Sequence, residues 1–217
     1  MTGRCSIWIP LILWAAGVSA LLLTVEPENE WAWVSDGGFV QVSSLVVLTF
    51  ASVAAGWLAL TDRVRRWVHL EFAFLLAAYA AREGDLHEHL SRHAKVSQPG
   101  RFFPHPEIPL ALKIVVFLAM AVLLWLLFRL FRYHFKGLVH GLKERKPWAA
   151  LVLAWLGAFF LSQLLDQTPL NDYFAGRITE ECLELLAAVY VSIALIVWAR
   201  DAAGSSVLDP WRTPEAH

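Results

Sequence analysis

The stretch "EFAFLLAAYAAREGDLHEHLSRH", residues 71–93, places a dense group of charged residues directly after an apolar segment. Its uninterrupted apolar run, Phe72–Ala81, has only ten residues, whereas a helix that crosses a bilayer needs about 20. Charged side chains close to hydrocarbon are costly unless they are paired, hydrated or coordinated. The stretch therefore predicts a helix, at about 67–89, that other helices shield from lipid and whose polar end lines a cavity. A re-entrant or interfacial segment is the alternative.

The composition of the whole chain is that of an integral membrane protein. Of its 217 residues, 58% are hydrophobic and 17% are charged, against roughly 45–50% and about 25% in soluble domains. The 11 Trp and 13 Phe residues fit the aromatic belts of a membrane interface. Two cysteines, Cys5 and Cys182, are too few for a disulfide framework. Nothing indicates nucleic-acid binding, because the basic residues lie in short loops next to apolar runs.

Six apolar segments predict an all-α fold, a polytopic membrane bundle of six transmembrane helices. The predicted spans are 6–25, 39–60, 67–89, 111–131, 147–166 and 181–199. We expect residues 1–200 to form the transmembrane domain. The remainder, 201–217, is rich in Gly, Ser and Pro and is expected to form a polar cytoplasmic tail.

The charges between the spans predict the orientation. With a cytoplasmic N-terminus, the segments on the inner side hold 12 of the 18 Lys and Arg residues, and the outer segments 25–38, 82–113 and 166–181 hold 12 of the 19 Asp and Glu residues. Basic residues are in excess in cytoplasmic loops. The sequence therefore predicts a multi-pass protein of the cell inner membrane with both termini in the cytoplasm.

Under this topology, unusual polar residues from four segments lie at one depth near the outer face. The predicted catalytic carboxylates are Glu83, Asp85 and Glu184. The predicted substrate-binding residues are Arg82, Gln41, Asp166 and Glu181. Ionisable groups inside a membrane indicate a functional site.

Helical spacing connects carboxylates with imidazoles in this region. Residues four apart share a helix face, which pairs Glu83 with His87 and Asp85 with His89. Because His and Asp suit Zn, Mn or Fe, His87, His89 and Asp85 are the predicted ligands of a divalent metal such as Zn. Two alternatives stay open: a solvated extension beyond Arg82, and a buried ion-pair network without a ligand.

Three motifs resemble those of known membrane proteins. "DGGFVQ" (36–41), "AAREGDLH" (80–87) and "EECLEL" (180–185) resemble uncharacterised bacterial polytopic inner-membrane proteins with an A-R-E-x-D-x-H signature, and this resemblance implies the topology. The chain also resembles the ceramidase-like intramembrane hydrolases, which use His and Asp zinc ligands, and this implies a zinc-dependent hydrolase. Those proteins carry further His ligands in a late helix, where this chain has Glu181 and Glu184.

We expect a metal-dependent membrane hydrolase or lipid-modifying enzyme that acts on a lipid or small molecule in the bilayer. One alternative is a proton- or cation-coupled transporter, in which the carboxylates bind and release the ion. Another is a non-enzymatic accessory subunit that docks a membrane-protein partner. The sequence leaves enzymatic activity open.

Reporter fusions test the predicted topology. Fusions after residues 35, 100 and 172 should all report an outer location, because the segments at these positions carry most of the acidic residues. A cytoplasmic signal from the fusion at residue 100 would contradict the six-span arrangement.

Overall fold

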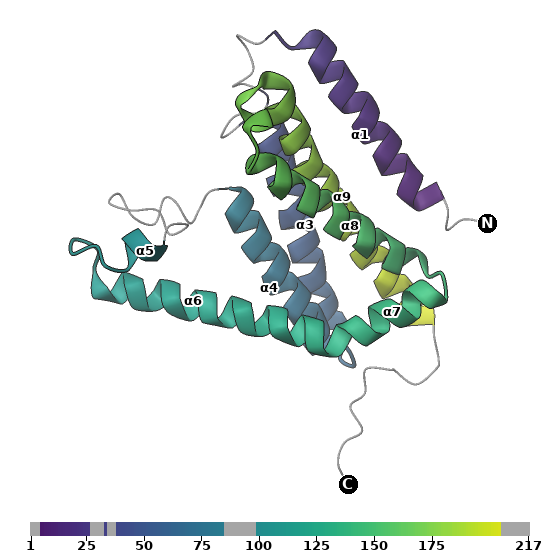
Figure 1. The fold of residues 1–217 in the computed structure, drawn as a ribbon. Helices are drawn as coiled ribbons and strands as arrows, with labels where there is room; N and C mark the ends of the chain where they lie inside the picture. The colour runs from purple at the N-terminus through teal and green to yellow at the C-terminus, as the bar shows by residue number, and fades with distance from the viewer. Residues whose placement is uncertain (1–4, 27–32, 34–37, 85–98, 205–217) are drawn as a thin grey trace. The chain divides into compact units, whose positions relative to one another are not determined.

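The computed structural model describes residues 5–26, 33, 38–84 and 99–204, and its long elements are helices (Figure 1). In these residues, six helices have 18 or more residues: α1 (Cys5–Thr24), α3 (Phe39–Thr61), α4 (Arg66–Glu83), α6 (Leu110–Arg129), α8 (Pro147–Asp166) and α9 (Phe174–Gly204). Among them, α3, α6 with its continuation to Lys143, α8 and α9 are long and apolar enough to cross a membrane. A helix bonds its own backbone groups, as hydrocarbon requires, so these elements fit a membrane protein.

Four helices begin and end within two residues of the predicted spans: α1, α3, α6 and α8. The other two differ. The helix α9 begins at Phe174, seven residues before the predicted start at 181, because a helix accepts polar residues in exposed turns and does not begin only where hydropathy rises. The helix α4 ends at Glu83, with Gly84 as its C-cap, instead of at 89.

The segment 132–146, expected to be a cytoplasmic loop, is mostly helical. A π-helical turn (Leu130–His134) follows α6 and leads into α7 (Phe135–Lys143). The charged side chains of Lys136 and Lys143 are exposed in α7. A polar face directed to water lets the helix continue, although the same charges end the apolar run.

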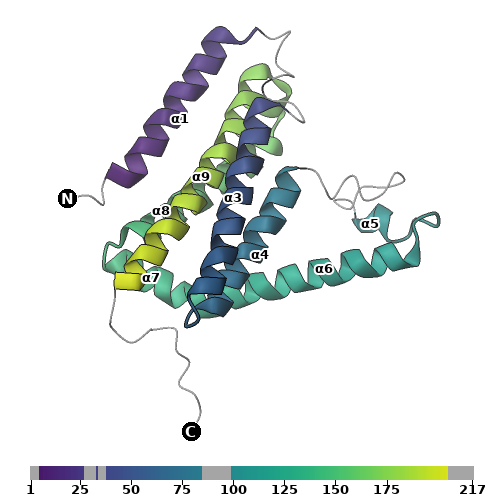
Figure 2. The same cartoon turned by 180° about the vertical axis from the view of Figure 1, so that it is seen from behind.

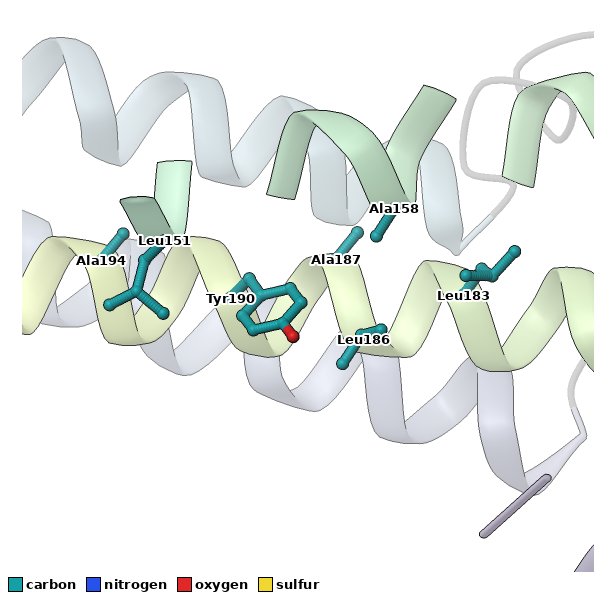
Figure 3. Close-up of a cluster of buried hydrophobic side chains, with 7 residues drawn as sticks. All are labelled: Leu151, Ala158, Leu183, Leu186, Ala187, Tyr190 and Ala194. Atoms are coloured by element: carbon teal, nitrogen blue, oxygen red, sulfur yellow. The ribbon is translucent and has the colours of Figure 1, made fainter. Parts of the chain in front are cut away.

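The chain forms two compact units, Met1–Val47 with Tyr133–His217, and Leu48–Arg132. The first is built on the helical hairpin of α8 and α9, which lie side by side from both directions of view (Figures 1 and 2). Its core consists of Leu151, Ala158, Leu183, Leu186, Ala187, Tyr190 and Ala194 (Figure 3). The alanines let two helix backbones approach closely, which is typical of helix packing in membranes.

The helix α9 is also covered by α1 and by the start of α3. Leu11 and Trp14 of α1 pack against the α8–α9 core, and Val40 of α3 packs with Ile178 and Cys182 of α9. As a result, 56% of the apolar window of α9 is buried, against 28% in α3 and 22% in α8.

The helix α9 is thus the enclosed helix of the first unit, whereas the shielding of α4 by the other helices stays a prediction, because α4 belongs to the second unit. Trp67 and Phe74 of α4 are 74% and 43% exposed. The apolar run of α4 is short because its ends carry His69, Glu71 and Glu83, which are buried with polar partners.

The second unit joins the rest of α3, α4, the short helix α5 (Pro99–Phe102) and α6. The hydroxyl of Ser52 in α3 donates a hydrogen bond to the carbonyl of Ala73 in α4, at 2.9 Å. Phe102, Ile108 and Val116 form a small core that holds α5 and the following turn against the start of α6.

A tight junction connects α7 to α8. Arg145 adopts a left-handed conformation (φ 56°). The N–H of Lys146 bonds to the carbonyl of Gly141 at 2.8 Å, and the N–H of Arg145 bonds to that of Leu142 at 3.0 Å, which together are the Schellman motif that ends a helix. Pro147 then opens α8, where it needs no N–H partner.

Gly141 lies against the first turn of α8. A Cβ atom at this position would lie 2.7 Å from Cζ2 of Trp148 and 3.1 Å from Cβ of Ala149. Gly157 in α8 is the matched control, because a Cβ there would have no atom within 4 Å.

Gly141→Leu should therefore lower the free energy of unfolding by about 1–3 kcal/mol, the cost of overpacking. Thermal unfolding in detergent micelles, followed by circular dichroism, measures the effect. Gly157→Leu should leave stability unchanged or raise it. Equal effects of the two substitutions would contradict the close α7–α8 contact.

Candidate functional site

Glu184 is a carboxylate inside the α8–α9 hairpin. It lies ten residues into α9, about 15 Å along the helix axis from Phe174, and its residue surface is only 8% exposed. The side-chain amide of Gln163 in α8 donates a hydrogen bond to Oε1 of Glu184 at 3.3 Å. The antiparallel hairpin packs Ala158 against Ala187 (Figure 3). The same hairpin brings Gln163 and Glu184 together.

Glu181 lies one turn before Glu184 and is half-buried. Because α9 begins at Phe174, Glu181 is two turns into the helix, whereas the favourable effect of a helix N-terminus on a carboxylate falls off within the first turn. The helix dipole therefore does not explain why an acid stands here.

Glu83 ends α4 and is buried, 5% exposed. Nη1 of Arg82 lies 3.1 Å from Oε1 of Glu83, and the Arg82 side chain is partly exposed. This ion pair gives the buried carboxylate a cationic partner at the end of the apolar run. Breaking a buried pair by removing one partner is strongly destabilising, so Arg82 and Glu83 act as a unit.

The other predicted substrate-binding residues lie in the first unit. Gln41 is half-buried in the first turn of α3. Asp166 is the last residue of α8 and is exposed, and its Oδ2 accepts a hydrogen bond from the amide of Gln167 at 3.0 Å. Glu184 and Glu83 belong to different units, so the single pocket that joins them stays a prediction.

The three predicted metal ligands, Asp85, His87 and His89, lie outside the described residues. Within residues 5–26, 38–84 and 99–204, no group of three or more His, Cys, Asp and Glu side chains is placed to hold a metal ion. The divalent metal therefore also stays a prediction.

The sequence did not lead us to predict Gln163 as a residue of the site. It stands within the apolar run "LVLAWLGAFFLSQLL" (151–165), and a polar amide inside a spanning helix often hydrogen-bonds across to a neighbouring helix. The antiparallel order of α8 and α9, with Gln163 near the end of one and Glu184 near the start of the other, is the signal that would have found the pair.

A second group of polar side chains lies at the other end of α4. Nη2 of Arg129 in α6 lies 2.6 Å from Oε1 of Glu71. In the α3–α4 turn, Oδ2 of Asp62 lies 3.5 Å from Arg65 and 3.4 Å from Nε2 of His69. Glu71 is about 18 Å along α4 from Glu83, so this group is separate from the Arg82–Glu83 pair.

Comparison of the chain with protein-family models, with curated proteins and with solved structures finds no match.

A double-mutant cycle on Gln163 and Glu184 tests the buried hydrogen bond. The two single Leu variants and the double variant are compared in unfolding experiments in micelles. They should give a coupling energy of about 1 kcal/mol between the two residues, because the bond is charge-assisted and shielded from water. The matched control is the exposed neighbour pair Asp166 and Gln167, whose coupling should be near zero. Additive effects at Gln163 and Glu184 would show that the bond is absent in solution.

Proposed function

We propose that the chain is a six-span protein of the cell inner membrane with both termini in the cytoplasm. Four helices have the length and apolarity of spans, and α1 and α4 complete the six. The excess of Lys and Arg in alternate segments supports the orientation.

We infer that this protein moves protons or monovalent cations across the membrane, with Glu184 as the residue that binds the ion. The observation that carries the inference is the burial of the Glu184 carboxylate in a stretch of α9, Cys182–Ala199, that holds no other charged residue. Carboxylates at such positions are expensive and mark ion pathways. The hydrogen bond from the Gln163 amide holds the Glu184 carboxylate inside the α8–α9 hairpin.

The first unit also offers a route to this carboxylate. Asp166 is exposed, Glu181 is half-buried and Glu184 is buried. The register that pairs Gln163 with Glu184 places Asp166 and Glu181 at the same end of the hairpin. A cation attracted first by Asp166 would meet a second carboxylate before it reaches Glu184. Gln41, at the start of α3 in the same unit, is proposed to line the outer end of this route.

Ion flux into proteoliposomes tests the proposal. Purified full-length protein is reconstituted with trapped pH and sodium indicators, and a potassium diffusion potential drives cation entry. With the wild-type protein, protons or sodium ions should enter the lumen. Glu184→Gln, which removes the charge, should slow this entry at least about tenfold. Glu26→Gln is the control, because Glu26 is exposed beyond the end of α1.

Two results would contradict the transport function. Proton and sodium entry that is no faster in wild-type proteoliposomes than in protein-free liposomes would show that the chain moves neither ion. Equal flux in the wild type and in folded Glu184→Gln would show that Glu184 does not bind the ion.

A metal-dependent hydrolase or lipid-modifying enzyme is the second candidate. Buried Glu83 is followed within six residues by Asp85, His87 and His89, a ligand set that suits Zn. In this function Glu83 or Glu184 would act as general base on a metal-bound water. About one equivalent of Zn, Mn or Fe per chain in the purified protein would favour this function. Purified protein that holds no metal and still moves ions would contradict it.

A further inference from the structure

Five arginines lie at the end of the second unit where α3 turns into α4 and where α6 ends. We name them, with two exposed tryptophans, the basic interfacial cluster: Arg63, Arg65, Arg66, Arg129 and Arg132, with Trp67 and Trp125. The carboxylates among them are Asp62 and Glu71, which leaves a net charge of +3 with His69 neutral.

The α3–α4 turn is braced from inside by Asp62. Oδ1 of Asp62 accepts hydrogen bonds from the N–H groups of Val64 at 3.1 Å and Arg65 at 3.2 Å. Burial disfavours the charged carboxylate, but the backbone bond from Arg65, the hydrogen bond to His69 and the charges of Arg65 and His69 together lower the pKa of Asp62 below its usual value. The turn is therefore held by a charged group.

The exposed basic side chains of this turn are Arg63 and Arg66. Because Asp62 fixes the backbone between them, both guanidinium groups start from a defined turn instead of a loose loop. A preorganised site loses less entropy when it binds a ligand.

The end of α6 is tied to the same place. Arg129 bridges from α6 to Glu71 in α4, and its guanidinium carbon lies 4.9 Å from the centroid of the Trp125 ring. The last turns of α6 lie beside the start of α4 in both views (Figures 1 and 2). Arg132, one turn further along, is exposed.

Apolar groups are exposed among these charges. Trp67 is 74% exposed, Val64 71% and Trp125 54%. Trp side chains favour the depth of the lipid headgroups, where the ring meets both hydrocarbon and polar groups. Guanidinium groups and exposed indoles side by side match a ligand that is anionic at one end and apolar at the other.

We propose that the basic interfacial cluster binds the phosphate of an anionic phospholipid. Guanidinium groups bind phosphate oxygens through paired, charge-assisted hydrogen bonds, and basic pockets between membrane helices bind anionic headgroups. Trp67 and Trp125 contact the glycerol and upper acyl region. Basic residues that only orient the protein in the membrane would not distinguish one lipid from another. Selective binding of an anionic lipid therefore distinguishes this proposal from a purely topological role of the arginines.

Native mass spectrometry of the full-length protein in detergent tests the proposal. The protein is titrated with phosphatidylglycerol or with phosphatidylcholine, and soluble glycerol phosphate is the competitor. The wild type should bind phosphatidylglycerol at least about tenfold more tightly than phosphatidylcholine. Arg63→Gln with Arg66→Gln should remove this preference, and Arg63→Lys with Arg66→Lys should keep much of it, because Lys also binds phosphate as a point charge.

The matched control is Lys136→Gln with Lys143→Gln, two exposed basic residues outside the cluster, which should bind phosphatidylglycerol as the wild type does. Circular dichroism confirms folding of each variant, and Arg132→Gln alone serves if the double variant unfolds. Equal binding of the two lipids overturns the proposal, as does an unchanged preference in the folded arginine variants. Complete displacement by glycerol phosphate assigns the site to a soluble phosphate and also overturns it.

Discussion

The contact between α8 and α9 is the interaction on which the rest of the first unit depends. Ala158 and Ala187 point toward one another between the two helices (Figure 3), and small side chains of this kind let helix backbones pack closely where lipid offers no hydrophobic drive for association. With α1 and the start of α3 on its other sides, α9 becomes the enclosed helix. That enclosure places Glu184 in apolar surroundings, where burying a polar group is costly unless it is hydrogen-bonded. The hairpin supplies such a partner in Gln163.

Two buried carboxylates of the described residues are paired across helices. Glu71 meets Arg129 of α6, and Glu184 meets Gln163 of α8, whereas Arg82 and Glu83 pair within α4. An Arg–carboxylate pair removes the charge from the apolar surroundings and favours a structural role. The Gln163 amide orients the Glu184 carboxylate within the α8–α9 hairpin, and the proposed function is centred on this buried acid.

The apolar runs alone predict four helices to within two residues, because a spanning helix must be long and apolar whatever it packs against. The same reasoning fails at α4 and α9, where the helix boundary and the edge of the apolar run do not coincide. The short apolar run of α4 also reflects the buried charged residues Glu71 and Glu83 near its ends. The pairing of Arg82 with Glu83 follows from their adjacency in the sequence. The partners of Glu71 and Glu184 on other helices could not be predicted, because the rotation of each helix about its axis decides which polar residue faces which. Gln163 is the clearest case: its residue type was visible in the sequence, but its partner was not.

Cysteine cross-linking in native membranes tests the α8–α9 register most directly. In a background with Cys5 and Cys182 replaced by Ser, the pair Ala158→Cys and Ala187→Cys is oxidised with copper phenanthroline. The structure predicts rapid disulfide formation, because these side chains meet in the core of the hairpin. Ala158→Cys with Ile196→Cys, whose native side chain is exposed on α9, should not cross-link. Cross-linking of the control pair but not of Ala158→Cys with Ala187→Cys would contradict the register that buries Glu184 against Gln163.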